Sequence, residues 1–260
     1  MTKKLSSYFQ KGLVALAAAA VCSSAFAAGV WRVATEGTFP PFEFYNSKTG
    51  EIQGFEVDLV KAMAGVMDKE LKLQTMSFDA IIPAMISGTI DAGAAGFSIT
   101  PERAKKVSYT VPFYESGLTI VVPKENKAGI SDFKDLEGKR IAVQLGTTSM
   151  TYAKKIKGAE ITTFNSAGDA ILSMLAGNAD AVINDKPVTD YILSQSKDMN
   201  AKCTHLAPMA TADQFAMITT KENKALADEM SAALKKLKAD GTFDKLHEKW
   251  FGKPSDGKLP

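Results

Sequence analysis

The feature that most constrains the fold is a segment that occurs twice, once in each half of the chain. The sequence DAIIPAMISGTIDA, residues 79–92, resembles DAILSMLAGNADA, residues 169–181. Each copy begins with an acidic residue suited to a helix N-terminus, carries apolar residues at helical spacing, reaches a glycine suited to the end of a helix, and continues into an apolar stretch. Each copy therefore predicts a helix followed by a strand. A chance match of short alanine-rich segments is the alternative.

A second pair of similar segments precedes the first pair. WRVATEGT, residues 31–38, and RIAVQLGT, residues 140–147, both indicate a short β-strand that ends in a Gly-Thr turn. The order strand, helix, strand thus occurs once in each half. We expect two α/β lobes of similar plan, because alternating strands and helices build a sheet that is covered by helices.

Two stretches would connect these lobes. The run FYESGLTIVVPKEN, residues 113–126, is strand-like and would leave the first lobe. After Ala216 the sequence predicts a strand and two helical segments, separated by Asp240-Gly241, whose apolar residues need a surface to cover. If these helices return to the first lobe, the chain crosses between the lobes twice. Two crossings form a hinge with a cleft, which is a common place for a ligand site.

The N-terminal segment is typical of an export signal. Basic residues in MTKKLSSYFQK precede the apolar run GLVALAAAAV, and Ala25-Phe26-Ala27 has the form of a secretory cleavage site. We expect a mature protein that starts near Ala28 and is exported to the periplasm. Lipidation at Cys22 is the alternative, although Val21 before it is larger than the small residue of such a processing site.

Cleavage there would change the charge and the cysteine count. The full chain has 31 Lys and Arg against 29 Asp and Glu, a net charge of +2. Loss of Lys3, Lys4 and Lys11 would leave 28 basic against 29 acidic residues, a net charge of −1. This balance gives no basis for nucleic-acid binding or a polybasic membrane anchor. Only Cys203 would remain, so an intramolecular disulfide could not form. A hydrophobic core must then stabilise the fold.

The stretch GFSITPERAKK, residues 96–106, contains an arginine in an unusual place. Thr100 and Pro101 predict a helix start, with the hydroxyl as N-cap and the proline in the first turn. Arg103 then lies where the helix dipole is already positive. A bound anion would explain this placement, helped by free backbone N–H groups near Gly96 and at the helix start. Exposure to solvent or a surface ion pair is the alternative.

Polar residues gather where the predicted strands end, which in open α/β sheets is the edge that holds the ligand. The candidates are Glu36, the segment AAGFSIT with Ala95, Gly96 and Ser98, Gln144 with Thr147 and Thr148, and Asn184 with Asp185. Arg103 and an aspartate facing one cleft could hold an α-carboxylate and an α-ammonium. Phe39 and Phe78 could be walls, although most aromatic residues of the first quarter should be core. Glu36 and Asp185 could instead be turn or N-cap carboxylates.

Motifs for catalysis, metals and cofactors are missing from the sequence. His205 and His247 are the only histidines, and neither belongs to a known nucleophile motif. No P-loop, G-x-G-x-x-G or Cys-His metal spacing occurs, so we expect no cofactor and no metal. An open cleft for binding without turnover is the interpretation that these residues favour.

At this point the sequence resembles a known family, the polar amino-acid-binding proteins of ABC importers, of the glutamine, arginine and lysine/arginine/ornithine/histidine type. The resemblance covers essentially the whole mature chain. It runs in order through VATEGTFPPFEF, GFEVDLVKAMA, FDAIIPAM, GFSITPERAKKVSYTVPFY, DLEGKRIAVQLGTTS, ADAVINDKPV and DGTFDKLHEKWFG. It implies the type II periplasmic-binding-protein fold, in which two α/β lobes joined by two hinge strands close on one free amino acid. It also implies delivery to an ABC transporter permease, and we expect a monomer.

The resemblance also implies boundaries and roles. After a signal peptide over residues 1–27, the first lobe would comprise 28–112 and 214–260, the second lobe 118–208, and the hinge strands 113–117 and 209–213. Arg103 matches the arginine that grips the α-carboxylate, helped by the backbone at Ser98 and Thr148. Asp185 matches the carboxylate that takes the α-ammonium, with the Ser98 hydroxyl and the Gly96 carbonyl. Phe39 and Phe78 match the walls, and Glu36 and Gln144 stand where the side-chain end is read.

The sequence does not decide which amino acid is the ligand. Glutamine-type members carry Asp, Lys and His where this chain has Glu36, Gln144 and Asn184, whereas arginine-type members are similar at Glu36, Gln144 and Thr147-Thr148. An acidic ligand is disfavoured because its second carboxylate would face Glu36 without a cation. A neutral amide and a cationic side chain both fit. A periplasmic dehydratase of prephenate-like acids and a ligand-presenting subunit of a sensor are the other functions that this fold could serve.

Overall fold

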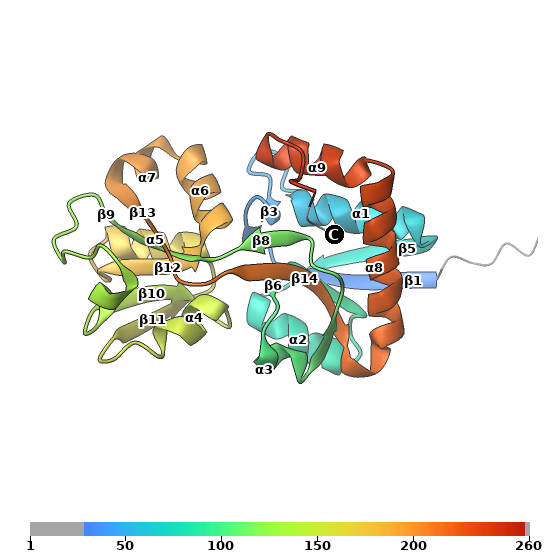
Figure 1. Cartoon of the computed structure of the whole chain (residues 1–260), viewed down its shortest axis with the longest axis horizontal. Coiled ribbons are helices and arrows are strands. Elements are labelled where there is room, and N and C mark those ends of the chain that lie inside the picture. The colour runs from blue at the N-terminus through green and yellow to red at the C-terminus, as the bar shows by residue number, and fades with distance from the viewer. Residues whose placement is uncertain (1–28, 258–260) are drawn as a thin grey trace, which may run out of the picture.

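The computed structural model describes residues 29–257 as two α/β lobes, each built on its own sheet (Figure 1). This two-lobed architecture confirms the fold class. The expected signal peptide lies outside the described residues. No helix within 29–257 combines the length and the apolar character that crossing a membrane requires.

The first lobe is built on the larger sheet, whose strand order is β5-β1-β6-β14-β7 with β8 also paired to β14. Its strands are β1 (Gly29–Thr35), β5 (Lys69–Thr75), β6 (Ala92–Ser98), β7 (Val107–Tyr109), β8 (Tyr114–Ser116) and β14 (Asp213–Thr220). A small sheet beside it contains β2 (Thr38–Phe39), β3 (Glu43–Tyr45) and β4 (Ile52–Gln53). The helices of this lobe are α1 (Phe55–Val66), α2 (Phe78–Ile86), α3 (Pro101–Ala104), η2 (Lys221–Asn223), α8 (Lys224–Ala239) and α9 (Thr242–Phe251).

The second lobe is built on a five-stranded sheet of order β11-β10-β12-β9-β13. Its strands are β9 (Leu118–Pro123), β10 (Arg140–Gln144), β11 (Glu160–Phe164), β12 (Ala181–Asp185) and β13 (Cys203–Met209). Its helices are η1 (Phe133–Leu136), α4 (Thr148–Ala153), α5 (Ala167–Leu175), α6 (Lys186–Gln195) and α7 (Lys197–Lys202). The central strands β9, β10 and β12 are almost entirely buried, as expected for a sheet covered by helices on both faces. Cys203 is buried in this lobe as a free thiol.

The internal repeat is confirmed down to its hydrogen bonds. β1 lies parallel between β5 and β6, as β10 lies parallel between β11 and β12. Arg32 in the middle of β1 binds Asp91, just before β6, through its backbone N–H, Nε and Nη2, with Nη2 to Oδ1 at 2.6 Å, and its Nη1 donates to the Gly88 carbonyl. Arg140 at the start of β10 makes the same bonds to Asp180 and the Gly177 carbonyl, with Nη2 to Oδ1 at 2.7 Å.

The chain crosses between the sheets twice, along two antiparallel paths that lie side by side (Figure 1). One path leads from β8 through Gly117 into β9. The other returns from β13 to β14, and the Ala210 N–H donates to the Leu118 carbonyl between the two paths. The strand-like run 113–126 therefore serves both sheets. The exact lobe and hinge boundaries remain a prediction, and both predicted hinge segments, 113–117 and 209–213, lie on these two crossing paths.

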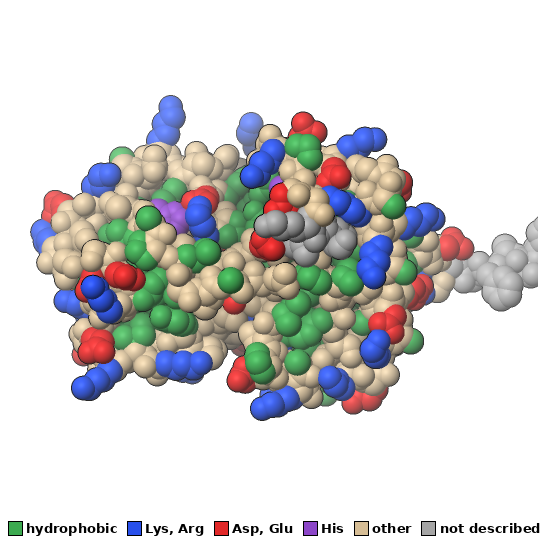
Figure 2. Space-filling model, in the orientation of Figure 1, with side chains coloured by type: hydrophobic (Ala, Val, Ile, Leu, Met, Phe, Trp, Pro, Cys, Tyr) green, Lys and Arg blue, Asp and Glu red, His purple; other side chains and the backbone are tan. Residues whose placement is uncertain are grey.

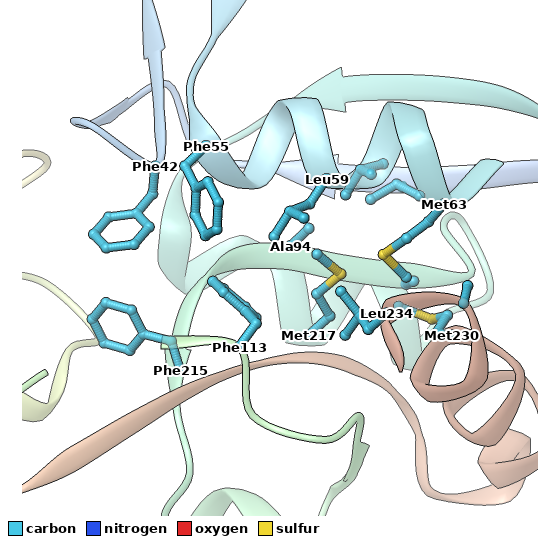
Figure 3. Packing of buried hydrophobic residues seen from close by; sticks show 14 of the residues in the cluster. Phe42, Phe55, Leu59, Met63, Ala94, Phe113, Phe215, Met217, Met230 and Leu234 are labelled. Carbon is cyan, nitrogen blue, oxygen red and sulfur yellow. The ribbon is translucent and has the colours of Figure 1, made fainter. Parts of the chain in front are cut away.

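The C-terminal helices return to the first lobe, because α8 and α9 both pack against α1. Figure 3 shows the core that they cover, with aromatic side chains gathered at one end and aliphatic and methionine side chains at the other. The labelled residues are Phe42, Phe55, Phe113 and Phe215 at the first end, and Leu59, Met63, Ala94, Met217, Met230 and Leu234 toward the second. Burial of each large apolar side chain contributes about 1.5–3 kcal/mol. Phe42 and Phe55 are thus core residues, as expected.

On the visible face of the molecule, acidic and basic side chains are interspersed, and the outline is indented where the two lobes meet (Figure 2). This even distribution agrees with the small net charge of the sequence.

Candidate functional site

A narrow space lies between the lobes, where the strands β1, β6, β10 and β12 end, and it leaves only about 10 Å³ for the centre of a water-sized molecule. We call it the interlobe cavity. The structure brings eleven of the twelve predicted site residues to its walls: Glu36, Phe39, Phe78, Ala95, Gly96, Ser98, Arg103, Gln144, Thr147, Thr148 and Asp185. They converge because the carboxyl ends of parallel strands meet at one edge of each sheet, and the two edges face each other.

Asn184 is the predicted residue that does not line the cavity. Its side chain is buried, and its Nδ2 donates to the Thr189 hydroxyl at 3.1 Å. Successive residues of a strand point to opposite faces. Since Asp185 faces the cavity, Asn184 faces helix α6 and supports that helix instead.

Arg103 is a half-buried cation that forms no ion pair with a described carboxylate. Its Nη1 donates to the Ser98 carbonyl at 3.0 Å and its Nη2 to the Gly146 carbonyl at 3.2 Å. Burial lowers the pKa of the guanidinium below its usual value. Thr100 caps α3 by accepting from the Arg103 N–H, as the sequence predicts. The positive charge at this helix start is therefore partly shielded from solvent and has no ion-pair partner among the described residues, and it borders the interlobe cavity.

Asp185 faces the same cavity from the second lobe at the end of β12. The Ser116 hydroxyl donates to its Oδ1 at 2.8 Å, and no described residue donates to its Oδ2. Burial raises the pKa of Asp185 to about 7, although the Ser116 bond opposes this shift. Ser116 belongs to a crossing strand and is a contact that the sequence did not indicate. The cavity thus has a cationic group on one lobe and a carboxyl group on the other.

Glu36 and Gln144 bring a second carboxyl and an amide to the cavity. Glu36 accepts from the Thr38 N–H at 3.1 Å and from the Thr38 hydroxyl. Burial raises the pKa of Glu36 to about 7, against these hydrogen bonds. Gln144 donates from Nε2 to the Asn165 carbonyl at 3.0 Å, so its amide oxygen is left free to accept.

The hydroxyls and backbone groups of the cavity differ in availability. Thr147 caps α4, since its Oγ1 accepts from the Met150 N–H and donates to the Gln144 carbonyl. The hydroxyls of Ser98 and Thr148 make no hydrogen bond to a described residue. The expectation of a free N–H at Gly96 is wrong, because this N–H donates to Glu56 Oε2 at 2.7 Å.

Aromatic rings form the walls. Phe39 packs against Phe42 and Phe215, with ring centroids 5.8 and 6.0 Å apart, and also borders the cavity. Phe78 stacks on Phe97 at 4.7 Å, and the Arg103 guanidinium carbon lies 5.3 Å from the Phe78 ring centre. The guanidinium therefore lies over the Phe78 ring, which keeps water from that side of it.

The two lobes touch at this site, so the structure is a closed one. Gly146 of the second lobe has a φ of +78°, and a Cβ there would lie 3.0 Å from the Asp79 Cβ of the first lobe. The bond from Arg103 to the Gly146 carbonyl joins the same two lobes. Gly146 appeared in the sequence as part of a turn, and nothing there indicated that it is a contact between lobes.

Comparison with known proteins identifies the family. Bacterial extracellular solute-binding proteins, family 3, match this sequence over residues 31–253. The chain belongs to this family. One family relative, the ABC transporter arginine-binding protein 1 of Escherichia coli (strain K12), is 33% identical over 217 residues, which cover 82% of this chain and 87% of that protein.

Solved structures show the same fold. Two structures of an ancestral arginine-binding protein, one bound to arginine and one bound to glutamine, are each 38% identical to this family 3 chain, with TM-scores of 0.81. They cover 87% and 86% of this chain and 100% and 99% of their own. The ancestral amino acid-binding protein AncCDT-1, a precursor of cyclohexadienyl dehydratase, is 37% identical with a TM-score of 0.77, covering 86% of this chain and 96% of that one. This likeness confirms the type II periplasmic-binding-protein fold.

Proposed function

We propose that this protein is an extracytoplasmic receptor that captures a polar L-amino acid in the interlobe cavity and delivers it to the membrane permease of an ABC transporter. The observation that carries the proposal is Arg103, a half-buried guanidinium that borders the cavity and forms no ion pair with a described carboxylate. A ligand carboxylate could bind this planar guanidinium through two parallel hydrogen bonds.

The ligand's backbone groups have complementary partners in the cavity. Its α-carboxylate binds Arg103 and the Thr148 N–H at the start of α4. Its α-ammonium binds Asp185, the Ser98 hydroxyl and the Gly96 carbonyl oxygen. Each end of the ligand thus contacts residues of both lobes, so one bound molecule bridges the lobes and holds the cleft closed.

The side-chain end of the ligand lies toward Glu36 and Gln144. A guanidinium or ammonium group would pair with the Glu36 carboxylate, and an amide would exchange hydrogen bonds with Gln144. The relatives support both classes, since the ancestral protein is bound to arginine in one structure and to glutamine in the other. We favour a cationic side chain, with arginine first, because Glu36 is buried without a cation.

The test starts from the purified protein. Mass spectrometry of the molecule released on denaturation identifies the native ligand, and calorimetry then measures its affinity. Arg103→Ala should weaken binding at least about thirtyfold, because it leaves the ligand carboxylate unpaired, at about 2–5 kcal/mol. Arg140→Ala removes an arginine from the distant strand start of the second lobe and should leave the affinity unchanged. Unchanged binding by Arg103→Ala would refute the assignment.

The proposal includes export and free secretion. Residues 1–27 would be a cleaved signal peptide, and the mature monomer would work in the periplasm with the lobe boundaries given above. The intact mass of the exported protein tests cleavage after Ala27 against lipidation at Cys22. Size-exclusion chromatography with light scattering tests the monomer.

Binding without turnover is part of the proposal, and one further activity has an observation in its favour. Glu36 and Asp185 are carboxyl groups with a pKa of about 7 in an enclosed cavity, as an acid catalyst needs. AncCDT-1 stands at the origin of a dehydratase. Incubation with prephenate, followed by a spectrophotometric assay for the aromatic product, decides between binding without turnover and dehydratase activity. We expect no product.

A further inference from the structure

Two buried glutamates form the least satisfied polar group of the described chain. Glu43 in β3 and Glu56 in the first turn of α1 are both fully buried. Both carboxyl oxygens of Glu43 and Oε1 of Glu56 accept no hydrogen bond from any other described residue, and the two carboxyl groups bond to each other when one of them is protonated. Buried polar groups are normally paired, so such a cluster requires an explanation.

The cluster lies directly beneath the wall of the interlobe cavity. Glu56 Oε2 accepts the Gly96 N–H at 2.7 Å. A Cβ at Gly96 would lie 2.6 Å from the Phe39 ring, so Gly96 and Phe39 are in tight contact. Phe39 in turn pairs with Glu43 across β2 and β3. The two acids thus hold two neighbouring elements of the cavity wall.

Gly96 needs this support because the strand ladders leave it. β6 pairs with β1 at Ala92 and Gly93, and its pairing with β14 shifts register between Ala216 and Ile218. Gly96 has a φ of +57°, which breaks the regular strand geometry. A backbone N–H outside a ladder needs another acceptor when it is buried. Glu56 is that acceptor.

The charge state of the pair follows from its surroundings. Burial raises the pKa of Glu56 to about 8 and that of Glu43 well above its usual value, and the neighbouring carboxyls add to the effect on Glu43. The titratable groups that face the pair are each other and Glu36 at the end of β1; β6 contributes none, and no described cation is close enough to pair with them. The pair therefore holds protons at neutral pH.

Stability alone does not explain these residues. Replacing buried ionisable groups with apolar side chains of similar volume is often neutral or stabilising. Glu56 Oε2 accepts from the backbone of a cavity residue, whereas the remaining interaction of the pair is a hydrogen bond between the two carboxyl groups.

We infer that Glu56, backed by Glu43, is a positioning residue of the amino-acid site, which fixes Gly96 so that its carbonyl oxygen points to the ligand's α-ammonium. This assignment rests on the proposed function. Glu56 touches no ligand itself and acts through Gly96 and the Phe39 wall.

Three variants test the assignment by calorimetry with L-arginine and L-glutamine as probes. Glu56→Leu removes the acceptor and should weaken binding about tenfold, which corresponds to one lost hydrogen bond. Glu56→Gln keeps an oxygen for the Gly96 N–H and should restore affinity to within about twofold. Asp58→Asn, a matched control on the same helix that loses an acid bound to Lys249 and Trp250, should bind as the wild type does.

The outcomes separate the two proposals. A wild type that binds neither probe would contradict the proposed function and this assignment with it. A wild type that binds, together with a Glu56→Leu variant of equal affinity or a Glu56→Gln variant as weak as Glu56→Leu, would overturn this assignment alone. If Glu56→Leu does not fold, a crystal structure of the wild type with L-arginine decides: a Gly96 carbonyl oxygen beyond hydrogen-bond distance of the α-ammonium refutes the assignment.

Discussion

Ligand binding should release protons, because the cavity holds two carboxyl groups that a cationic ligand would ionise. Glu36 and Asp185 both have a pKa of about 7 in the closed structure without ligand. The proposed pose gives Asp185 the α-ammonium of any amino acid. It gives Glu36 a cation only when the ligand side chain is charged.

The size of the effect follows from these pKa values. A group with a pKa of about 7 is about half protonated at pH 7, and a cation beside it lowers its pKa by about 1–3 units. Binding of glutamine should then release about half a proton at pH 7, and binding of arginine about one. At pH 5.5 about 97% of each carboxyl is protonated before binding. Between pH 8 and 5.5 the affinity should therefore fall up to roughly 30-fold for each carboxyl that the ligand ionises.

Calorimetry in buffers of different ionisation enthalpy measures this release directly. The slope of the observed binding enthalpy against the buffer enthalpy gives the number of protons released. Glu36→Gln should reduce the release on arginine binding from about one proton to about half, and should leave the release on glutamine binding unchanged. Zero release at pH 7 for both ligands, or proton uptake, would refute the placement of the ligand cations beside these carboxyls.

Three further outcomes are expected. The ligand-free protein should melt at a higher temperature at pH 5.5 than at pH 8.5. The reason is that carboxyls with a raised pKa bind more protons in the folded state, so stability is lost as the pH rises through about 7–8. In thermal scans Glu56→Gln should reduce this difference in melting temperature, and an unchanged difference would contradict the raised pKa of Glu56. Gly96→Ala should cost about 1–3 kcal/mol by denaturant unfolding and weaken ligand binding, owing to its positive φ and the Phe39 contact. Gly88→Ala, also at positive φ but with open space around it, is the control and should leave binding unchanged. Arg103→Met should abolish the ligand-induced rise in melting temperature without lowering that of the ligand-free protein, and a large loss of ligand-free stability would show that Arg103 is chiefly structural.

Much of the site could be predicted because it lies at strand ends. The repeat located β1, β6, β10 and β12, and parallel strands place their carboxyl ends together, so residues far apart in sequence, such as Glu36 and Asp185, could be expected in one cavity. Whether they bind a ligand is still a prediction. What the structure adds is their convergence and their burial.

Other contacts could not be read from the sequence, each for a physical reason. A residue at a strand end can face either side of the sheet. The sequence therefore did not show which of Asn184 and Asp185 faces the cavity, because that depends on the strand register. Gly96 appeared to offer a free N–H, because its acceptor, Glu56, is forty residues away on a helix. Ser116 lies in a crossing strand without any motif, and its bond to Asp185 depends on how the lobes are joined.

The two matching Arg–Asp pairs have a consequence for how the ligand specificity of such a protein can evolve. Arg32 with Asp91 and Arg140 with Asp180 join neighbouring strands where β6 and β12 begin, whereas the interlobe cavity lies where the strands end. The residues that secure each sheet and the residues that border the ligand are thus separate sets at opposite edges. Substitutions at the cavity edge can therefore alter ligand specificity without breaking the Arg–Asp pairs at the opposite edge. New specificities can evolve in this way while the fold is conserved.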